Sequence, residues 1–529
     1  MKKRKWIRWA VWVIGILLIL LIAGNFIVKS AIEKKLQASL QQLRPYVQAG
    51  FSKAHINLLT ASVQLDSVYI KYDPELKQQH THTLQFSSAV ITDIHFFKLI
   101  LHKDFSAGLL SLKNTDIQLD HHLLNHNNSL PDSFYARMQL PFKNVSLNTI
   151  EIKNVKISQR NNAKLSNICT GNILLKNVFI PAIDTVLTTD SIRFGNIVCD
   201  LQDINYQLKN YYSVQLKKFH INSRDSVAAL DSLKLMPQLG KYEMGQRLGR
   251  QVDHINAAVK NIEVSGLDVK QLLQKKFIAR QISINNANAY VFRDRRLPRS
   301  KEKQPMPLDY LKQIPYGMDV QRFDLNNATV TSEEFPGEGD HTGYIKLENV
   351  NITMKPLRNY ATKTNASINS FVKASIMGAG NIQADINLSM TDGSSRIKGA
   401  IDELHLTAMN PSAENLGKFH IESGILNRLD FEFTATDTKA TGQIVGVYHD
   451  LVIDRLKITK DGLKKASVPG FLLHKVIIPK NKDASLDVKH RTGKIDFERD
   501  PTRVVTFYYL KALLDGIRDS FALGFVLPS

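Results

Sequence analysis

One short apolar pattern recurs along this chain and constrains its fold more than any other feature. Two apolar residues lie two positions apart, two polar or small residues follow, and a second apolar pair with the same spacing comes next. Apolar residues two apart lie on one face of a β-strand. The two-residue insert breaks strict alternation, so a β-bulge or tight corner must return the second pair to the original face. The pattern therefore predicts long, bent strands, each with one apolar face.

Copies of the pattern occur in both halves of the chain, and their repetition favours an array of strands over one compact core. Typical inserts are Asp66-Ser67, Lys153-Asn154, Lys176-Asn177, Ser265-Gly266 and Asn326-Asn327. We predict a mainly β fold: an elongated, curved antiparallel β-sheet or groove with an N-terminal transmembrane helix and a few amphipathic helices. An ordinary antiparallel sandwich is the alternative, in which the apolar residues would be fully buried against a second sheet. The candidate groove-lining residues are Val63, Leu65, Ile150, Ile152, Val155, Ile157, Ile173, Leu175, Ile262, Val264, Phe323, Leu325, Ile345 and Leu347.

Residues 6 to 28 are predicted to form one uncleaved transmembrane helix. From Ala10 to Val28 the only strongly polar residue is Asn25. Roughly 22 residues rising ~1.5 Å each extend about 33 Å, enough to cross a hydrocarbon core of ~30 Å. The basic tip, residues 1–5, predicts a cytoplasmic N-terminus and export of the rest. A cleaved signal peptide is disfavoured because Ala23 and Asn25 make a poor small-x-small cleavage site.

The rest of the chain divides by pattern into five segments. A juxtamembrane helix is expected over residues 29–50, a first β segment over 51–226, a helical interruption over 227–256 and a second β segment over 257–500. A C-terminal amphipathic helix is expected over residues 501–529, with the apolar side chains of Phe507, Leu510, Leu514, Ile517 and Phe521 on one face.

A net charge of +20 is typical of nucleic-acid-binding proteins, but beyond the N-terminal tip the charges are scattered rather than clustered. An exported chain meets lipid headgroups rather than nucleic acid, so membrane lipids are the favoured partner and nucleic acid is not expected. Arg293, Arg295 and Arg296 are candidate headgroup contacts, with a solvated linker as the alternative. Cys169 and Cys199 could pair in an oxidising compartment, but two small apolar fillers are favoured.

Catalytic motifs are not found in the sequence. It contains no H-E-x-x-H, P-loop, G-x-S-x-G or G-x-G-x-x-G motif. His121, His122 and His126 form a small cluster, but no cysteine or carboxylate pattern completes a metal site. The sequence therefore predicts no enzyme activity, no cofactor and no metal.

Two stretches resemble the AsmA-like family. The first is the N-terminal layout, with its anchor and the run from Ile56 to Leu65. The second is the block from Leu404 to Leu456, which includes the run from Leu406 to Pro411 and the run from Tyr448 to Leu451. The resemblance implies a β-rich, periplasmic protein anchored in the bacterial inner membrane. The wider group, which includes TamB-like proteins, is linked to phospholipid transport toward the outer membrane, and the resemblance carries over no catalytic residues.

Together these observations predict a membrane-anchored periplasmic protein that binds or conveys phospholipid acyl chains and supports outer-membrane lipid homeostasis. The alternative is a non-enzymatic scaffold or assembly factor for cell-envelope proteins, in which exposed sheet edges add strands to a partner. An unrecognised hydrolase is a third, weaker hypothesis. Bound lipid would favour the first hypothesis, and a stoichiometric protein partner would favour the second.

Overall fold

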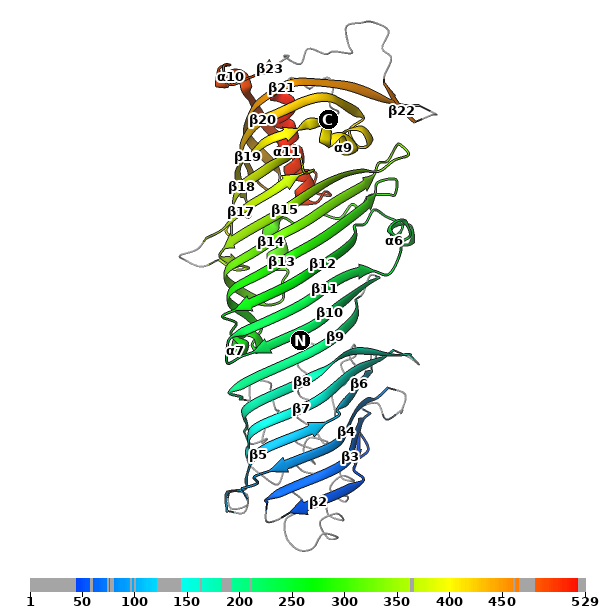
Figure 1. Ribbon diagram of the computed structural model, residues 1–529, viewed down its shortest axis with the longest axis vertical. Coiled ribbons are helices and arrows are strands. Elements are labelled where there is room, and N and C mark those ends of the chain that lie inside the picture. The colour runs from blue at the N-terminus through cyan, green and yellow to red at the C-terminus, as the bar shows by residue number, and fades with distance from the viewer. Residues whose placement is uncertain are drawn as a thin grey trace. The chain divides into compact units, whose positions relative to one another are not determined.

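The computed structural model describes residues 44–57, 60–73, 76, 80–95, 98, 101–120, 144–161, 164–181, 193–208, 211–361, 366–459, 462–465 and 481–521. These residues are mainly β-strand, as predicted (Figure 1). They divide into two compact units. The first unit comprises the described residues up to Tyr206 together with Gln215–Leu230. The second comprises Gln207–Val214 and the described residues from Asp231 onward.

The first unit is a sheet with a closed cluster of buried apolar side chains on one face. Its strands are β1 (Val47–Gly50), β2 (Lys53–Asn57), β3 (Ser62–Tyr72), β4 (His82–Thr92), β5 (Asp104–Lys113), β6 (Asp116–Asp120), β7 (Asn144–Asn161), β8 (Lys164–Ile180), and most of β9 (Asn196–Leu208) and β10 (Tyr212–Asn222). Leu65, Ile91 and Leu110, on three of these strands, are each 0% exposed. They belong to one cluster with Phe105 and Ile150, which are each 1% exposed.

The second unit is a longer run of strands with short helices between them. Its strands are most of β11 (Val227–Pro237), β12 (His254–Ser265), β13 (Lys276–Asp294), β14 (Gly317–Phe335), β15 (Gly343–Lys355), β16 (Leu357–Arg358), β17 (Ser367–Ile376), β18 (Gly380–Ser389), β19 (Ser395–His405), β20 (Phe419–Ala435), β21 (Lys439–Thr459), β22 (Gly462–Lys465), β23 (Asn481–Lys482) and β24 (Thr492–Glu498). Its helices are α6 (Lys241–Leu248), α7 (Val269–Leu273), α8 (Pro307–Lys312), the 3₁₀ turn η2 (Leu406–Met409), α9 (Asn410–Asn415), α10 (Val488–Arg491) and α11 (Val505–Ser520).

Both units are mixed sheets, which corrects the prediction of an antiparallel one. Strands β5 and β6 both pair in parallel with β7, and β13 pairs in parallel with β14. A parallel pair needs a connection that carries the chain back to the starting end of the sheet. Between β13 and β14 the connection is the segment from Arg295 to Tyr316, a loop with basic residues and prolines that is followed by α8. The alternation of apolar and polar residues does not predict that the chain returns to the starting end of the sheet.

The predicted bends are confirmed. The second residue of each insert has a left-handed backbone: φ is 50° at Ser67, 51° at Asn154, 52° at Asn177, 65° at Gly266 and 54° at Asn327. Strand pairing also shifts register between Ile152 and Val155, and between Leu325 and Ala328, as a β-bulge requires.

The bends of neighbouring strands are joined by asparagine side chains. Asn327 Nδ2 donates to Asn286 Oδ1 at 2.7 Å, and Asn326 Nδ2 donates to Asn285 Oδ1 at 2.9 Å. Asn285 Nδ2 in turn donates to Asn261 Oδ1 at 3.0 Å. The bends of β13 and β14 are therefore in register, and the polar ladder beside them reaches β12.

Three boundary predictions change. Residues 47–50 form β1, paired with β3, and not the end of the juxtamembrane helix: Pro45 interrupts a helical hydrogen-bond pattern, and Val47 becomes buried on pairing. The helical interruption shrinks to α6, because residues 227–237 form β11. The predicted C-terminal helix is α11, over residues 505–520. The predicted transmembrane helix and residues 29–43 lie outside the described residues.

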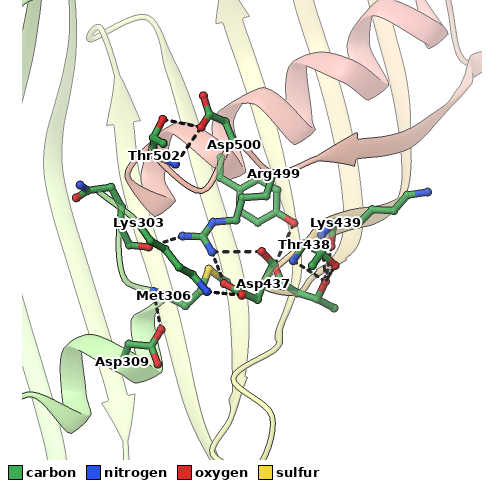
Figure 2. Close-up of polar contacts among 12 residues, drawn as sticks. Lys303, Met306, Asp309, Asp437, Thr438, Lys439, Arg499, Asp500 and Thr502 are labelled. Atoms are coloured by element: carbon green, nitrogen blue, oxygen red, sulfur yellow. Dashed lines mark hydrogen bonds and ion pairs between the residues drawn. The ribbon is translucent and has the colours of Figure 1, made fainter. Parts of the chain in front are cut away.

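The buried residue Arg499 connects three segments of the second unit that are far apart in the sequence (Figure 2). The Arg499 side chain is 0% exposed, and its guanidinium donates to the Asp437 carboxylate and, at 2.5 Å, to the Gln304 carbonyl oxygen. Lys303 Nζ lies 2.6 Å from the other oxygen of the same carboxylate. These contacts join the loop before α8, the turn between β20 and β21, and the segment that leads into α11.

Candidate functional site

Strands β12 to β18 of the second unit carry two rows of apolar side chains on one face. Residues opposite each other in paired strands share a face. Strand register therefore defines each row, and each residue named here is directly opposite the next. The first row is Ile262, Ile284, Leu325, Ile352, Val372 and Ala384, and the second begins Val264, Ile282, Phe323 and Met354. We call this surface the apolar ladder.

The apolar ladder is only half-buried. Ile262, Ile284, Leu325 and Phe323 are all of intermediate exposure, as are most other members, although Val264 is 7% exposed and Ala384 9%. Side chains sealed under a second layer would be nearly inaccessible, as they are in the first unit. Among the described residues, therefore, no second layer covers most of the apolar face over β12 to β18.

The opposite face of the same strands is polar. Asp324 is 4% exposed and accepts hydrogen bonds from Arg322 Nε at 2.6 Å, Gln281 Nε2 at 2.8 Å and Thr353 Oγ1 at 2.8 Å. The hydrogen bonds from Arg322 are the main cause that lowers the pKa of Asp324. An open depression of about 390 Å³ surrounds Phe371 on this face. Most of the residues that line it are polar or charged.

Two helices cover the margins of the apolar ladder. Leu308 of α8 packs against Ile368 and Leu388, which continue the apolar face on β17 and β18. At the other margin the second row continues through Ile386 and Ile397 to Phe433. These last two residues belong to the cluster formed with α11.

Helix α11 is held against this face by direct contacts. Tyr509 Oη lies 2.9 Å from Ser395 Oγ, and the rings of Tyr509 and Phe433 are 6.2 Å apart. The carboxylates of Asp515 and Asp519 accept hydrogen bonds from the backbone amides of β24, at 2.9 and 2.7 Å. The ladder is therefore bounded by α8 and α11.

The predicted headgroup contacts are all paired with carboxylates. Arg293 donates two hydrogen bonds of 2.8 Å to the Asp253 carboxylate. Arg295 Nη1 lies 3.2 Å from Glu334 Oε2. Arg296 binds Asp294 at 2.7 Å and stacks on Phe335, with its guanidinium carbon 3.7 Å from the ring centroid. Thus Arg296 contributes mainly to local structure.

Arg293 and Arg295 also lie close enough to two cations near α11 to perturb them. Burial lowers the pKa of Arg503, and the positive charges of Arg299, Arg295 and Arg293 lower it further. Burial likewise lowers the pKa of Lys511, followed by the charges of Arg295, Arg518 and Arg503. The end of β13, Arg503 and Lys511 of α11 therefore share one cationic region.

The predicted lining residues divide between the two units. Strand pairing confirms that Ile150 faces Leu175 and that Ile152 faces Ile173 on a common face. However, five predicted lining residues are buried: Val63 at 6% exposure, Leu65 at 0%, Ile150 and Val155 at 1% each, and Val264 of the second unit at 7%. The expectation of an accessible surface is wrong at these positions, and Val63, Leu65 and Ile150 pack into one buried cluster.

The other predicted lining residues remain half-buried. In the first unit they are Ile152, Ile157, Ile173 and Leu175. In the second unit they are Ile262, Phe323, Leu325, Ile345 and Leu347; the ladder contains the first three and also Val264. Sequence analysis did not identify Arg503, Lys511 and Arg518, although their spacing along a predicted helix was a usable signal.

Cysteine and metal chemistry contribute nothing to this site. Cys169 and Cys199 are free thiols, and burial raises the pKa of Cys199 to about 11. Among the residues that the structure describes, no group of three His, Cys, Asp or Glu side chains could hold a metal ion. His121, His122 and His126 lie outside those residues.

Comparisons with known proteins add no relative. Neither a protein-family model nor a curated protein matches the chain. Within the described ranges, no helix is both long enough and apolar enough to cross a membrane.

Proposed function

We propose that this protein is a membrane-anchored periplasmic protein that binds or conveys phospholipid acyl chains and supports outer-membrane lipid homeostasis. The single observation that carries the proposal is the half-buried apolar ladder on β12 to β18. It is supported by the apolar run at residues 6–28 and by the resemblance to AsmA-like proteins, which together suggest an anchor in the bacterial inner membrane.

The ladder has suitable dimensions for an acyl chain. It crosses β12, β13, β14, β15, β17 and β18, and strands spaced ~4.8 Å apart make it about 24 Å long. One leaflet of a ~30 Å hydrocarbon core is about 15 Å deep, so a chain fits along the ladder. Each buried methylene stabilises the complex by about 0.8 kcal/mol, so binding needs no catalytic group.

A pair of adjacent substitutions on opposite faces tests the proposal. Val372 lies on the ladder, while Phe371 points to the polar face and is 43% exposed. Neither side chain is sealed, so an aspartate at either position stays hydrated and the fold should persist. The full-length protein would be purified in a mild detergent. Mass spectrometry would measure the phospholipid bound per protein, and labelling by a phospholipid with a photoreactive acyl chain would measure acyl-chain binding.

We expect Val372→Asp to lose most of the photoprobe labelling and Phe371→Asp to retain it, with unchanged melting temperatures for both. Equal labelling of both variants and the wild type would contradict the proposal. A wild-type protein without bound lipid, but with a stoichiometric protein partner, would instead support the scaffold hypothesis.

A further inference from the structure

Helix α11 has two opposite faces of different character. Tyr508, Ala512, Gly516 and Ser520, spaced by four, are buried toward the sheet. Residues 507, 511, 514 and 518 recur at intervals of four, three and four, and so lie along the opposite side, and residue 503 lies two positions before the first residue of the helix. They are Arg503, Phe507, Lys511, Leu514 and Arg518, and we call them the cationic stripe.

The cations of the stripe lack adequate carboxylate partners. Within the described residues, no carboxylate oxygen lies within ion-pair distance of Lys511 or Arg518. The Nε atom of Arg518 is buried and has no hydrogen-bond partner. The nearest carboxylate to Arg503 is that of Asp500, at 4.0 Å, and Arg299 already binds it at 2.6 Å.

The stripe also combines charge with apolar surface. The guanidinium carbon of Arg503 lies 4.7 Å from the centroid of the Phe507 ring, and Lys511 Nζ lies 5.8 Å from the same centroid. Phe507 and Leu514 therefore alternate with the cations along the helix. An anion with an attached hydrocarbon portion would match both kinds of group.

Repulsion among the positive charges of this region favours a bound anion. Among the described residues, six cations lie in this region, namely Arg293, Arg295, Arg299, Arg503, Lys511 and Arg518, and three carboxylates, those of Asp253, Glu334 and Asp500, form ion pairs with some of them. Partly buried positive charges without partners are unfavourable, and a bound anion would relieve both their repulsion and their desolvation.

We infer that the cationic stripe binds the negatively charged headgroup of an anionic membrane phospholipid whose acyl chains lie on the apolar ladder. The inference rests on the proposed function and adds the headgroup class. The helix covers the continuation of the ladder at Ile397 and Phe433, so tails on the ladder would place the headgroup beside α11. Lysine and arginine clusters beside apolar side chains are suited to anionic headgroups.

The test uses the full-length protein in a neutral detergent. Two fluorescent phospholipids with identical chains would be compared, phosphatidylglycerol and phosphatidylcholine. The variant Lys511→Gln/Arg518→Gln removes two cations of the stripe, and Lys270→Gln/Lys373→Gln removes two exposed cations elsewhere in the same unit. Melting temperatures report whether each variant folds, and removing mutually repelling cations should not lower them.

We expect the wild type and the Lys270/Lys373 variant to prefer phosphatidylglycerol. The Lys511/Arg518 variant should bind phosphatidylglycerol about tenfold more weakly, a change of about 1.4 kcal/mol, and bind phosphatidylcholine unchanged. The inference would be overturned if the wild type bound the two lipids equally, or if both variants lost the same amount of phosphatidylglycerol binding. In either case, intact phosphatidylcholine binding would still support the proposed function. Failure of the wild type to bind either lipid would overturn both.

A further arm separates the lipid from free phosphate. Inorganic phosphate at millimolar concentration should leave phosphatidylglycerol binding nearly unchanged, because the lipid is also held by its chains. If inorganic phosphate abolished the preference at that concentration, the stripe would be a site for a soluble anion, which would contradict a lipid-headgroup site.

Discussion

Single residues at the bends control which way each strand presents its apolar face. Asn327 has φ of 54° and donates to Asn286, which has φ of 55°. Asparagine tolerates this left-handed backbone better than most residues, because its short polar side chain bonds locally. Sequence analysis located the bends because the insert interrupts alternation. It did not predict that asparagines would link neighbouring bends, since strand neighbours were unknown.

The strain at such a bend can be measured. We expect Asn327→Ala to be about 1 kcal/mol less stable than Asn327→Gly, because glycine adopts positive φ without a Cβ penalty while both variants lose the same amide. Urea denaturation of the two variants measures the difference. Within a regular strand, a variant with alanine is more stable than one with glycine. If Asn327→Ala proved more stable than Asn327→Gly, Asn327 would not be at a bend.

A buried histidine makes the first unit sensitive to acid. The backbone amide of Asp120 donates to His82 Nδ1 at 3.0 Å, a contact that requires that nitrogen to be unprotonated. Burial lowers the pKa of His82 from 6.5 to about 4, although the charge of Asp120 opposes the shift. The unfolded chain therefore takes up a proton at higher pH than the folded one does.

The sign of the pH effect follows from this difference. Stability should be fully present above pH 6.5 and decline as the pH falls toward about 4. Urea denaturation across this range, followed by a probe in the first unit, should show a smaller decline in His82→Leu than in the wild type. The same decline in the variant would assign the acid sensitivity to other groups.

At the scale of elements, sequence analysis predicted the strands well and the faces of α11 poorly. Leu510, placed on the apolar face, is 42% exposed, while small residues such as Ala512 and Gly516 are buried. Gly516 allows close approach, because a Cβ there would lie 2.8 Å from Ile495 Cγ1. Hydropathy favours large apolar residues, so a helix that packs through small ones is assigned the wrong face.

The Arg499 contacts are the main polar connection that fixes α11 to the loop before α8. We expect Arg499→Ala to lower the free energy of unfolding by about 1–3 kcal/mol, because hydrogen bonds to the Gln304 carbonyl and the Asp437 carboxylate are lost. Chemical denaturation of the full chain measures this. Arg396, which pairs with Glu432 on the surface at 70% exposure, offers a control whose loss should cost below about 1 kcal/mol. Equal effects would show that the Arg499 contacts do not stabilise the unit.

At the scale of the whole molecule, one sequence pattern serves two purposes. In the first unit, apolar residues of the pattern such as Leu65 and Ile150 are buried in one cluster. In the second unit, Leu325 and Val372 stay half-buried. The pattern predicts which residues share a face, because that depends on local alternation. It does not predict whether the face is covered, because covering depends on contacts with segments far away in the chain, such as α8 and α11.

The most direct test of the account is site-specific photo-crosslinking of the full-length protein in native membranes. A photoreactive amino acid would replace Ile284, Leu325 or Val372 on the apolar ladder, and Gln281, Phe371 or Gln383 on the polar face as matched controls. We predict that phospholipid attaches to the ladder positions and not to the controls. Labelling of both faces alike, or attachment of a protein to the ladder in place of lipid, would contradict the account.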